Sequence, residues 1–135
     1  MDLDNFEKLF LVANLLLTMD YKALYDKIMN IDSKIRFTTI CDMNGKIEHT
    51  GHREGATNVL TADESKNSLQ MAVTAWKSRN NLSAKIGAGN YVLAAYDKIK
   101  RITIPLGGEH LIYLTTEVDA DHTKIIDATL KLRQD

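Results

Sequence analysis

The sequence predicts an α+β fold in which a five-stranded antiparallel sheet carries packed helices. Three observations lead to this prediction. No glycine or proline precedes Gly45, and such a stretch favours helix. Turn signals at Asn44-Gly45 and Gly107-Gly108 join short strand-like runs, as hairpins do. A capped helix over about 61–80 separates two strands from three later ones. Hairpin-linked strands with interspersed helices give an α+β layering.

Residues 4–30 carry a helical stripe whose apolar side chains recur every three, four or seven positions. Either one long helix spans this range, or two helices meet near Thr18 to Asp20, where either residue can cap the second. We favour the break. We treat the 135 residues as a single domain, with an N-terminal helical extension over 1–19 and an α/β core over 20–135.

The extension is apolar on nearly every side between residues 9 and 17. A helix on the surface of a domain normally keeps one polar face. This segment must therefore be covered, either by its own domain or by a second copy of the chain. Leu11 and Leu15 are candidate contact residues for that interface.

Two predicted strands follow, over 35–42 and 46–51, because β-branched and apolar residues alternate there with polar ones. Thr61 and Glu64 form a predicted capping box at the start of the next helix. Its inner stripe contains Leu69, Ala72, Val73 and Trp76, widened by Met71 and Ala75. Three more strands are predicted over 90–95, 98–106 and 109–118, and a final helix is capped by Asp119 or Asp121.

Composition narrows the classes of function. The formal net charge is −1, whereas nucleic-acid binders usually carry a basic excess, so we expect no nucleic-acid partner. The one cysteine, Cys41, cannot form an internal disulfide, which indicates a reducing cytoplasm and a buried, inert thiol. The most apolar segment is about half the length of a membrane-spanning helix, so we expect no membrane insertion.

His49 and His52 are the only candidate metal ligands with close spacing. Neutral imidazole is a common zinc and copper ligand. Residues three apart on a strand point to opposite faces, however, and only a bend at Gly51 would bring the two rings together. Surface histidines are the simpler interpretation, and we assign no cofactor.

The sequence contains no recognisable catalytic constellation. Four carboxylates, Glu48, Glu54, Asp63 and Glu64, offer an acid/base pair, but capping and solvation explain them more simply. The Gly87-x-Gly89 motif precedes a strand rather than a helix, which is the wrong context for a phosphate loop. A cationic cluster at 98–101 is interpreted as a solvated turn or as a contact for acidic groups of a partner.

Residues from about 21 to 132 resemble the roadblock/LC7 and profilin-like group. The resemblance rests on the hairpin from Ile40 to Ile47, on Gly87-Ala88-Gly89, and on the pair of segments Thr103 to Gly108 and Leu111 to Leu114. It implies a five-stranded antiparallel sheet with the middle helix on one face and the terminal helices on the other.

The resemblance also implies a non-enzymatic scaffold or regulator that forms a homodimer and binds a protein partner, several of the family's partners being small GTPases. The implied dimer surface combines the middle helix with the third strand, so Trp76 and Tyr91 are candidate interface residues. Two alternatives stay open. A PAS-like sensory domain would show a cavity of roughly 300 Å³ or more, and a metal-binding protein would use His49 and His52.

Overall fold

The computed structural model describes residues 5, 7–8 and 20–134. The candidate interface residues Leu11 and Leu15 lie outside this part of the chain, so their role stays a prediction. Asp20 caps helix α2 (Tyr21–Met29) and its side chain accepts a hydrogen bond from the backbone N–H of Ala23 at 3.0 Å. A helix therefore begins directly after Asp20, whereas the prediction of a separate helix before it falls on residues outside the described part of the chain.

Five antiparallel strands form the sheet in the spatial order β2-β1-β5-β4-β3. The first and last strands in sequence, β1 and β5, lie next to each other at its centre. The α+β prediction with a five-stranded antiparallel sheet is confirmed. The strands are β1 (Ile35–Asp42), β2 (Ile47–His52), β3 (Val92–Ala95), β4 (Lys100–Leu106) and β5 (His110–Thr116).

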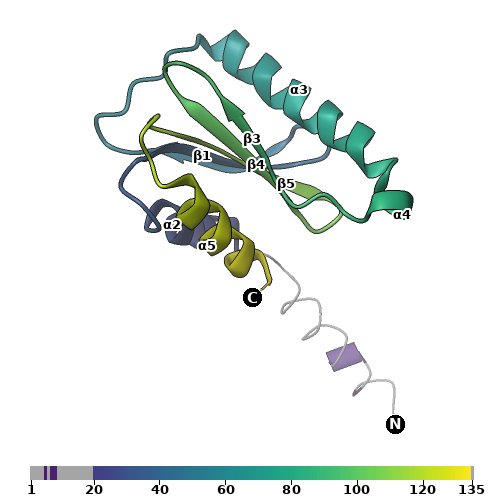
Figure 1. The fold of residues 1–135 in the computed structure, drawn as a ribbon. Helices are drawn as coiled ribbons and strands as arrows, with labels where there is room; N and C mark the ends of the chain where they lie inside the picture. Colours follow the sequence, from purple (N-terminus) through teal and green to yellow (C-terminus); the bar gives the residue numbers. More distant parts are fainter. Residues whose placement is uncertain (1–4, 6, 9–19, 135) are drawn as a thin grey trace.

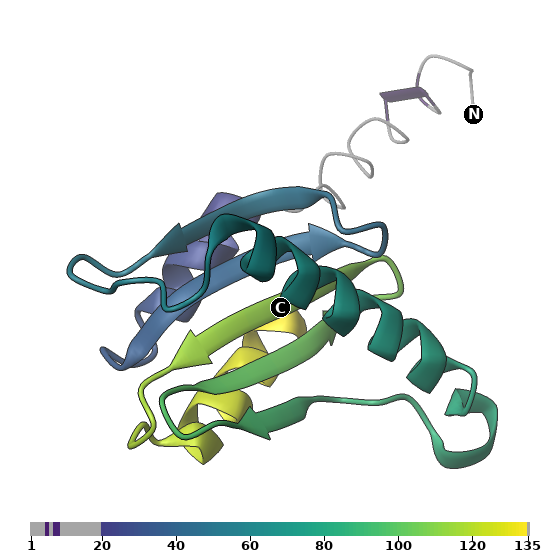
Figure 2. The same cartoon turned by 90° about the horizontal axis from the view of Figure 1, so that it is seen from above.

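Helices cover both faces of the sheet, as the resemblance implied. Helix α2 and helix α5 (His122–Gln134) lie on one face, and helix α3 (Ala62–Asn80) crosses the other (Figures 1 and 2). A single turn, α4 (Ser83–Ile86), follows α3 before the chain enters β3. The result is a three-layer arrangement with the sheet in the middle.

Short sequence motifs determine where these helices begin and where the chain turns. The predicted capping box is present, since Thr61 Oγ1 accepts from the backbone of Glu64 and the Glu64 carboxylate accepts from the backbone of Thr61. Gly45 has φ of +84°, as the Asn-Gly turn requires. The Asp42 carboxylate accepts hydrogen bonds from two backbone N–H groups of that turn, which lowers the pKa of this carboxyl.

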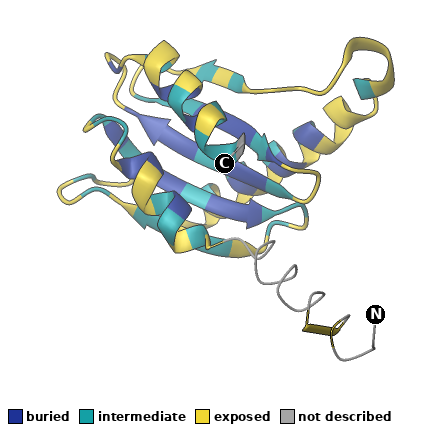
Figure 3. Ribbon diagram, turned by 90° about the horizontal axis from the view of Figure 1, so that it is seen from below, coloured by how far each residue is buried: buried dark blue, intermediate teal, exposed yellow. Residues whose placement is uncertain are grey.

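The two faces of the sheet pack very different cores. The larger core lies against α2 and α5 and contains the buried isoleucines of β1, β4 and β5 (Figure 3). The core beneath α3 is smaller, and its hydrophobic cluster contains five buried residues of the described chain, namely Cys41, Leu69, Val73, Trp76 and Leu111. Helix α3 is therefore held by a narrow apolar contact.

The predicted inner stripe of α3 needs one correction. Leu69, Val73 and Trp76 are buried as expected, but Met71 is 73% exposed. Met71 lies two positions from Leu69 and Val73, so the helical rotation of about 200° takes it out of the core beneath α3 and onto a flank of the helix. The apolar surface of α3 thus extends past the core onto its outer side.

The imidazole of His122 provides a test of pH dependence. Its Nε2 lies 2.8 Å from the hydroxyl oxygen of Thr116, and burial lowers its pKa below the ordinary value of 6.5. The unfolded chain therefore binds more protons than the folded one in the window below pH 6.5, and stability present above that pH is lost as the pH falls. We expect the free energy of unfolding by urea to decrease from pH 7.5 to 5.5. His122→Gln should flatten this dependence, and an unchanged slope would contradict the assignment.

Candidate interaction surface

The surface formed by α3 and β3 is the candidate functional site, and we call it the α3–β3 face. Strand β3 pairs only with β4, so among the described residues its outer edge has no strand partner. An open edge offers unpaired backbone groups to another chain. Tyr91, which is 49% exposed, precedes this strand, and Leu93 within it is exposed as well.

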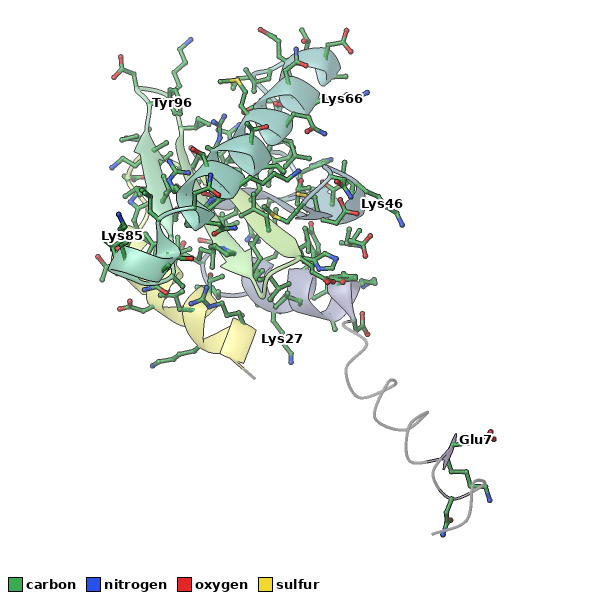
Figure 4. All side chains as sticks on the ribbon, turned by 90° about the vertical axis from the view of Figure 1, so that its right-hand side faces the viewer. Glu7, Lys27, Lys46, Lys66, Lys85 and Tyr96 are labelled. Atoms are coloured by element: carbon green, nitrogen blue, oxygen red, sulfur yellow. The ribbon has the colours of Figure 1, made fainter. Side chains whose placement is uncertain are left out.

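A cavity of about 760 Å³ separates α3 from strands β3 and β4. Met71 and Ala75 line it from the helix, and Val92 and Ala94 line it from β3. Tyr96, at the end of the β3–β4 hairpin, stands beside the same flank of α3 (Figure 4). Exposed apolar and aromatic side chains of this kind form the core of protein interfaces.

Trp76 is a core residue rather than an exposed anchor. Only 1% of it is exposed, and its indole N–H donates to the hydroxyl of Thr103 at 2.8 Å. The Gly87-x-Gly89 motif explains part of this burial. A Cβ at Gly89 would lie 2.5 Å from the Trp76 ring, so glycine lets the chain before β3 pass against the indole. We therefore leave Trp76 out of the contact surface, whereas Tyr91 stays a candidate.

A second cavity, of about 700 Å³, lies on the opposite flank of α3. Residues of β1, β2 and β5, with Arg101 of β4, line its sheet side, and Lys66 on α3 marks its side in Figure 4. The two cavities share Val59, Leu60, Ile99 and Arg101 as lining residues. Both volumes exceed the roughly 300 Å³ expected of a sensory domain, and the two cavities flank the small core that holds α3 on the sheet.

His49 and His52 do not form a chelating pair. The His49 ring packs against Tyr25 of α2 at a centroid distance of 4.7 Å, whereas the His52 ring packs against Phe37 at 5.3 Å on the α3 side. The strand therefore directs them to opposite faces, and Gly51 does not bend it enough to reunite them. Among the described residues no cluster of three or more metal-ligating side chains occurs.

The carboxylates singled out in the sequence serve separate local purposes. Glu64 completes the capping box, and the hydrogen bonds from Thr61 lower its pKa. Glu48 lies 3.7 Å from His110 Nε2, which in turn lies 2.9 Å from the hydroxyl of Tyr21. This cluster ties α2 to β5, and burial together with Glu48 raises the pKa of Tyr21. The four carboxylates do not meet in a single cleft.

Cys41 is a buried thiol, as predicted. It is fully covered by the small core beneath α3, and this burial raises its pKa to about 11. A thiol with such a pKa is protonated at neutral pH and is a poor nucleophile.

Comparison with known proteins identifies the fold. The chain has the roadblock/LC7 fold of the profilin-like group. It is similar to a roadblock/LC7 domain from Streptomyces avermitilis, with a TM-score of 0.65 and 11% identity over 86% of this chain and 92% of that one. It is also similar to MglB of Myxococcus xanthus, with a TM-score of 0.66 and 10% identity over 83% and 87% of the two chains.

Profilin IA of Acanthamoeba castellanii matches with a TM-score of 0.55 and 12% identity over 85% of this chain and 94% of that one. No family model matches the sequence, and no curated protein matches it significantly. At identities near 10% these likenesses establish the fold, and function must be argued from the surface. Within the described residues, no helix has the length and hydropathy needed to cross a membrane.

Proposed function

We propose that this chain is a regulatory protein-interaction module of the cytoplasm that pairs with a second copy of itself through the α3–β3 face. The observation that carries the proposal is the pair of exposed apolar side chains Met71 and Tyr96 on the α3 side, next to the open β3 edge that carries the exposed Tyr91 and Leu93. The domain division made from the sequence, with an extension before residue 20 and a core after it, is part of the same proposal.

Two kinds of contact support this pairing, one from the backbone of β3 and one from the apolar side chains of α3. A β3 edge pairs with the β3 edge of a second copy through backbone hydrogen bonds, which need no particular side chains. The apolar side chains of α3 and the cavity beside it then exclude water around that pairing. MglB, which has the same fold, is known in a tetrameric arrangement.

Light scattering on the eluting peak of a size-exclusion column tests the pairing. We expect a mass of twice 15.2 kDa at low micromolar concentration. Tyr91→Arg, which places a cation at the start of the open β3 edge, should shift the protein to the monomer by at least tenfold in dissociation constant, since a desolvated charge opposes burial.

The matched control is Val118→Arg, because Val118 is also an exposed apolar residue but lies in the turn after β5, away from this face. The control should remain dimeric. A wild-type monomer at 100 μM, or equal disruption by both variants, contradicts the proposal.

The finer proposal that a small GTPase is the partner rests on the roadblock resemblance. Its test is whether the purified module binds a small GTPase of its own cell with a preference for one nucleotide state.

A further inference from the structure

The sheet beneath the N-terminal half of α3 is unusually polar for a covered surface. Arg101 of β4 pairs with Thr115 of β5, and Thr115 pairs with Phe37 of β1, so these three residues adjoin one another across the floor of the 700 Å³ cavity. The neighbouring residues Ile102 and Leu114 point to the other face and enter the larger core. A floor of this kind cannot form a dry core with α3.

Arg101 is the least satisfied cation of that floor. Its one hydrogen bond reaches the hydroxyl of Tyr96 at 3.4 Å, and its Nε–H is buried without an acceptor. No carboxylate of the described residues lies within 4 Å of it. The rings of Tyr96 and Tyr113 lie 5.3 and 5.0 Å from its guanidinium carbon and hold the side chain in place. A guanidinium that is fixed but unpaired favours an incoming anion.

The rest of the cavity has a matching charge. Arg36 and Lys66 add two further cations, and no carboxylate occurs among the described residues that line this cavity. Arg36 is partly engaged, because it lies 3.5 Å from the Glu117 carboxylate and donates to the carbonyl of Thr57, but its Nε–H is also buried without an acceptor. Two cations therefore remain free for a ligand, the exposed Lys66 and the less exposed Arg101.

The remaining walls are apolar. Phe37 lies on the floor, Leu69 projects from α3, and Val59, Leu60 and Ile99 close the end that the two cavities share. A volume of about 700 Å³ lies within the range of small-molecule sites. We propose that this cavity binds a small organic carboxylate with an apolar body, the carboxylate on the Arg101 guanidinium and the body beneath α3.

The chemistry favours a carboxylate over a phosphate. A planar guanidinium matches a carboxylate with two parallel hydrogen bonds. A phosphate dianion costs more to desolvate against the apolar walls than a carboxylate monoanion does. The cavity lies mainly on the flank of α3 away from the proposed pairing surface and meets it at Arg101, which contacts Tyr96, but the inference needs no second copy of the chain and so goes beyond the proposed function.

The test is a titration of the full chain with 2-naphthoate, followed by ¹⁵N–¹H NMR shifts and by calorimetry, in parallel with 2-naphthylmethanol and inorganic phosphate. We expect 2-naphthoate to bind at least tenfold more tightly than the neutral alcohol and to shift the amides of Thr115, Phe37 and Leu60. Arg101→Met keeps the aliphatic stem between the tyrosines and should weaken naphthoate binding by about tenfold to a hundredfold. Lys98→Met is the matched control, since it removes a nearby cation that does not line this cavity.

Several outcomes overturn the proposal. Equal affinity for naphthoate and the alcohol would show an apolar cavity without anion recognition. Equal affinity for phosphate would remove the apolar body from the ligand class. No binding at millimolar naphthoate, or wild-type affinity in a folded Arg101→Met, would remove the site. Should Arg101→Met fail to fold, Arg101→Lys keeps the charge but loses the two-pronged contact, and its expected intermediate affinity carries the test together with the comparison of ligands on the wild type.

Discussion

Replacing Trp76 by alanine is expected to lower the free energy of unfolding by about 3–5 kcal/mol, because truncation of a buried tryptophan removes a large apolar volume and leaves a cavity. The effect is large here since Trp76 is the biggest of the five buried residues that hold α3 on the sheet. Urea unfolding followed by far-UV circular dichroism measures it. Fluorescence is unsuitable, because Trp76 is the only tryptophan of the chain.

Two further variants separate the contributions of the hydrogen bond of Trp76 and of the packing of its ring to the free energy of unfolding. Trp76→Phe keeps most of the ring but loses the hydrogen bond to Thr103, and it should cost about 1–2 kcal/mol. Gly89→Ala should destabilise the wild type by about 1–3 kcal/mol, since the added Cβ meets the indole at 2.5 Å. The same change should cost little in Trp76→Ala, where the ring is gone. Additive effects of the two substitutions would contradict the contact.

The order of the elements was predictable from the sequence because each boundary has a local signal. The alternation of apolar residues predicted β1 over 35–42, and the structure has Ile35–Asp42. Asp20 and Thr61 begin their helices through hydrogen bonds that depend only on neighbouring residues. The strand order β2-β1-β5-β4-β3 depends on contacts between distant segments, so it entered only through the resemblance to a known fold.

The candidate site was predicted less well, because exposure depends on tertiary packing. Trp76 was a candidate interface residue and Met71 a member of the inner stripe, but Trp76 is 1% exposed and Met71 is 73% exposed. Arg101 was interpreted as part of a solvated turn or a contact for acidic groups, yet it lies between two tyrosines under α3. One signal was available for Arg101. Alternation within β4 puts Arg101 and Thr103 on the same face, and Thr103 faces a buried tryptophan.

Replacing Arg53 by alanine is expected to cost about 2–4 kcal/mol, although Arg53 is a charged residue at the end of a strand. Its Nε–H donates to the carbonyl of Ile35 at 2.8 Å, and its Nη2 donates to the carbonyls of Met29 and Asp32 at 2.7 and 3.0 Å. Met29 is the last residue of α2, whose terminal carbonyls have no partner within the helix. Without the guanidinium, three carbonyls that joined α2 to β1 lose a charged donor.

The geometry of the guanidinium, rather than its charge alone, should set the size of this effect. Arg53→Lys preserves the charge near the carboxyl end of α2 but offers a single ammonium to three carbonyls, so we expect it to recover no more than about half of the loss. Lys77→Ala, an exposed substitution on α3, should stay within about 0.5 kcal/mol of the wild type and calibrates the urea measurement. Full recovery by lysine would show that charge alone stabilises this junction. An alanine variant as stable as Lys77→Ala would show that water replaces Arg53 without cost, and the α2–β1 connection would then be held by the larger core alone.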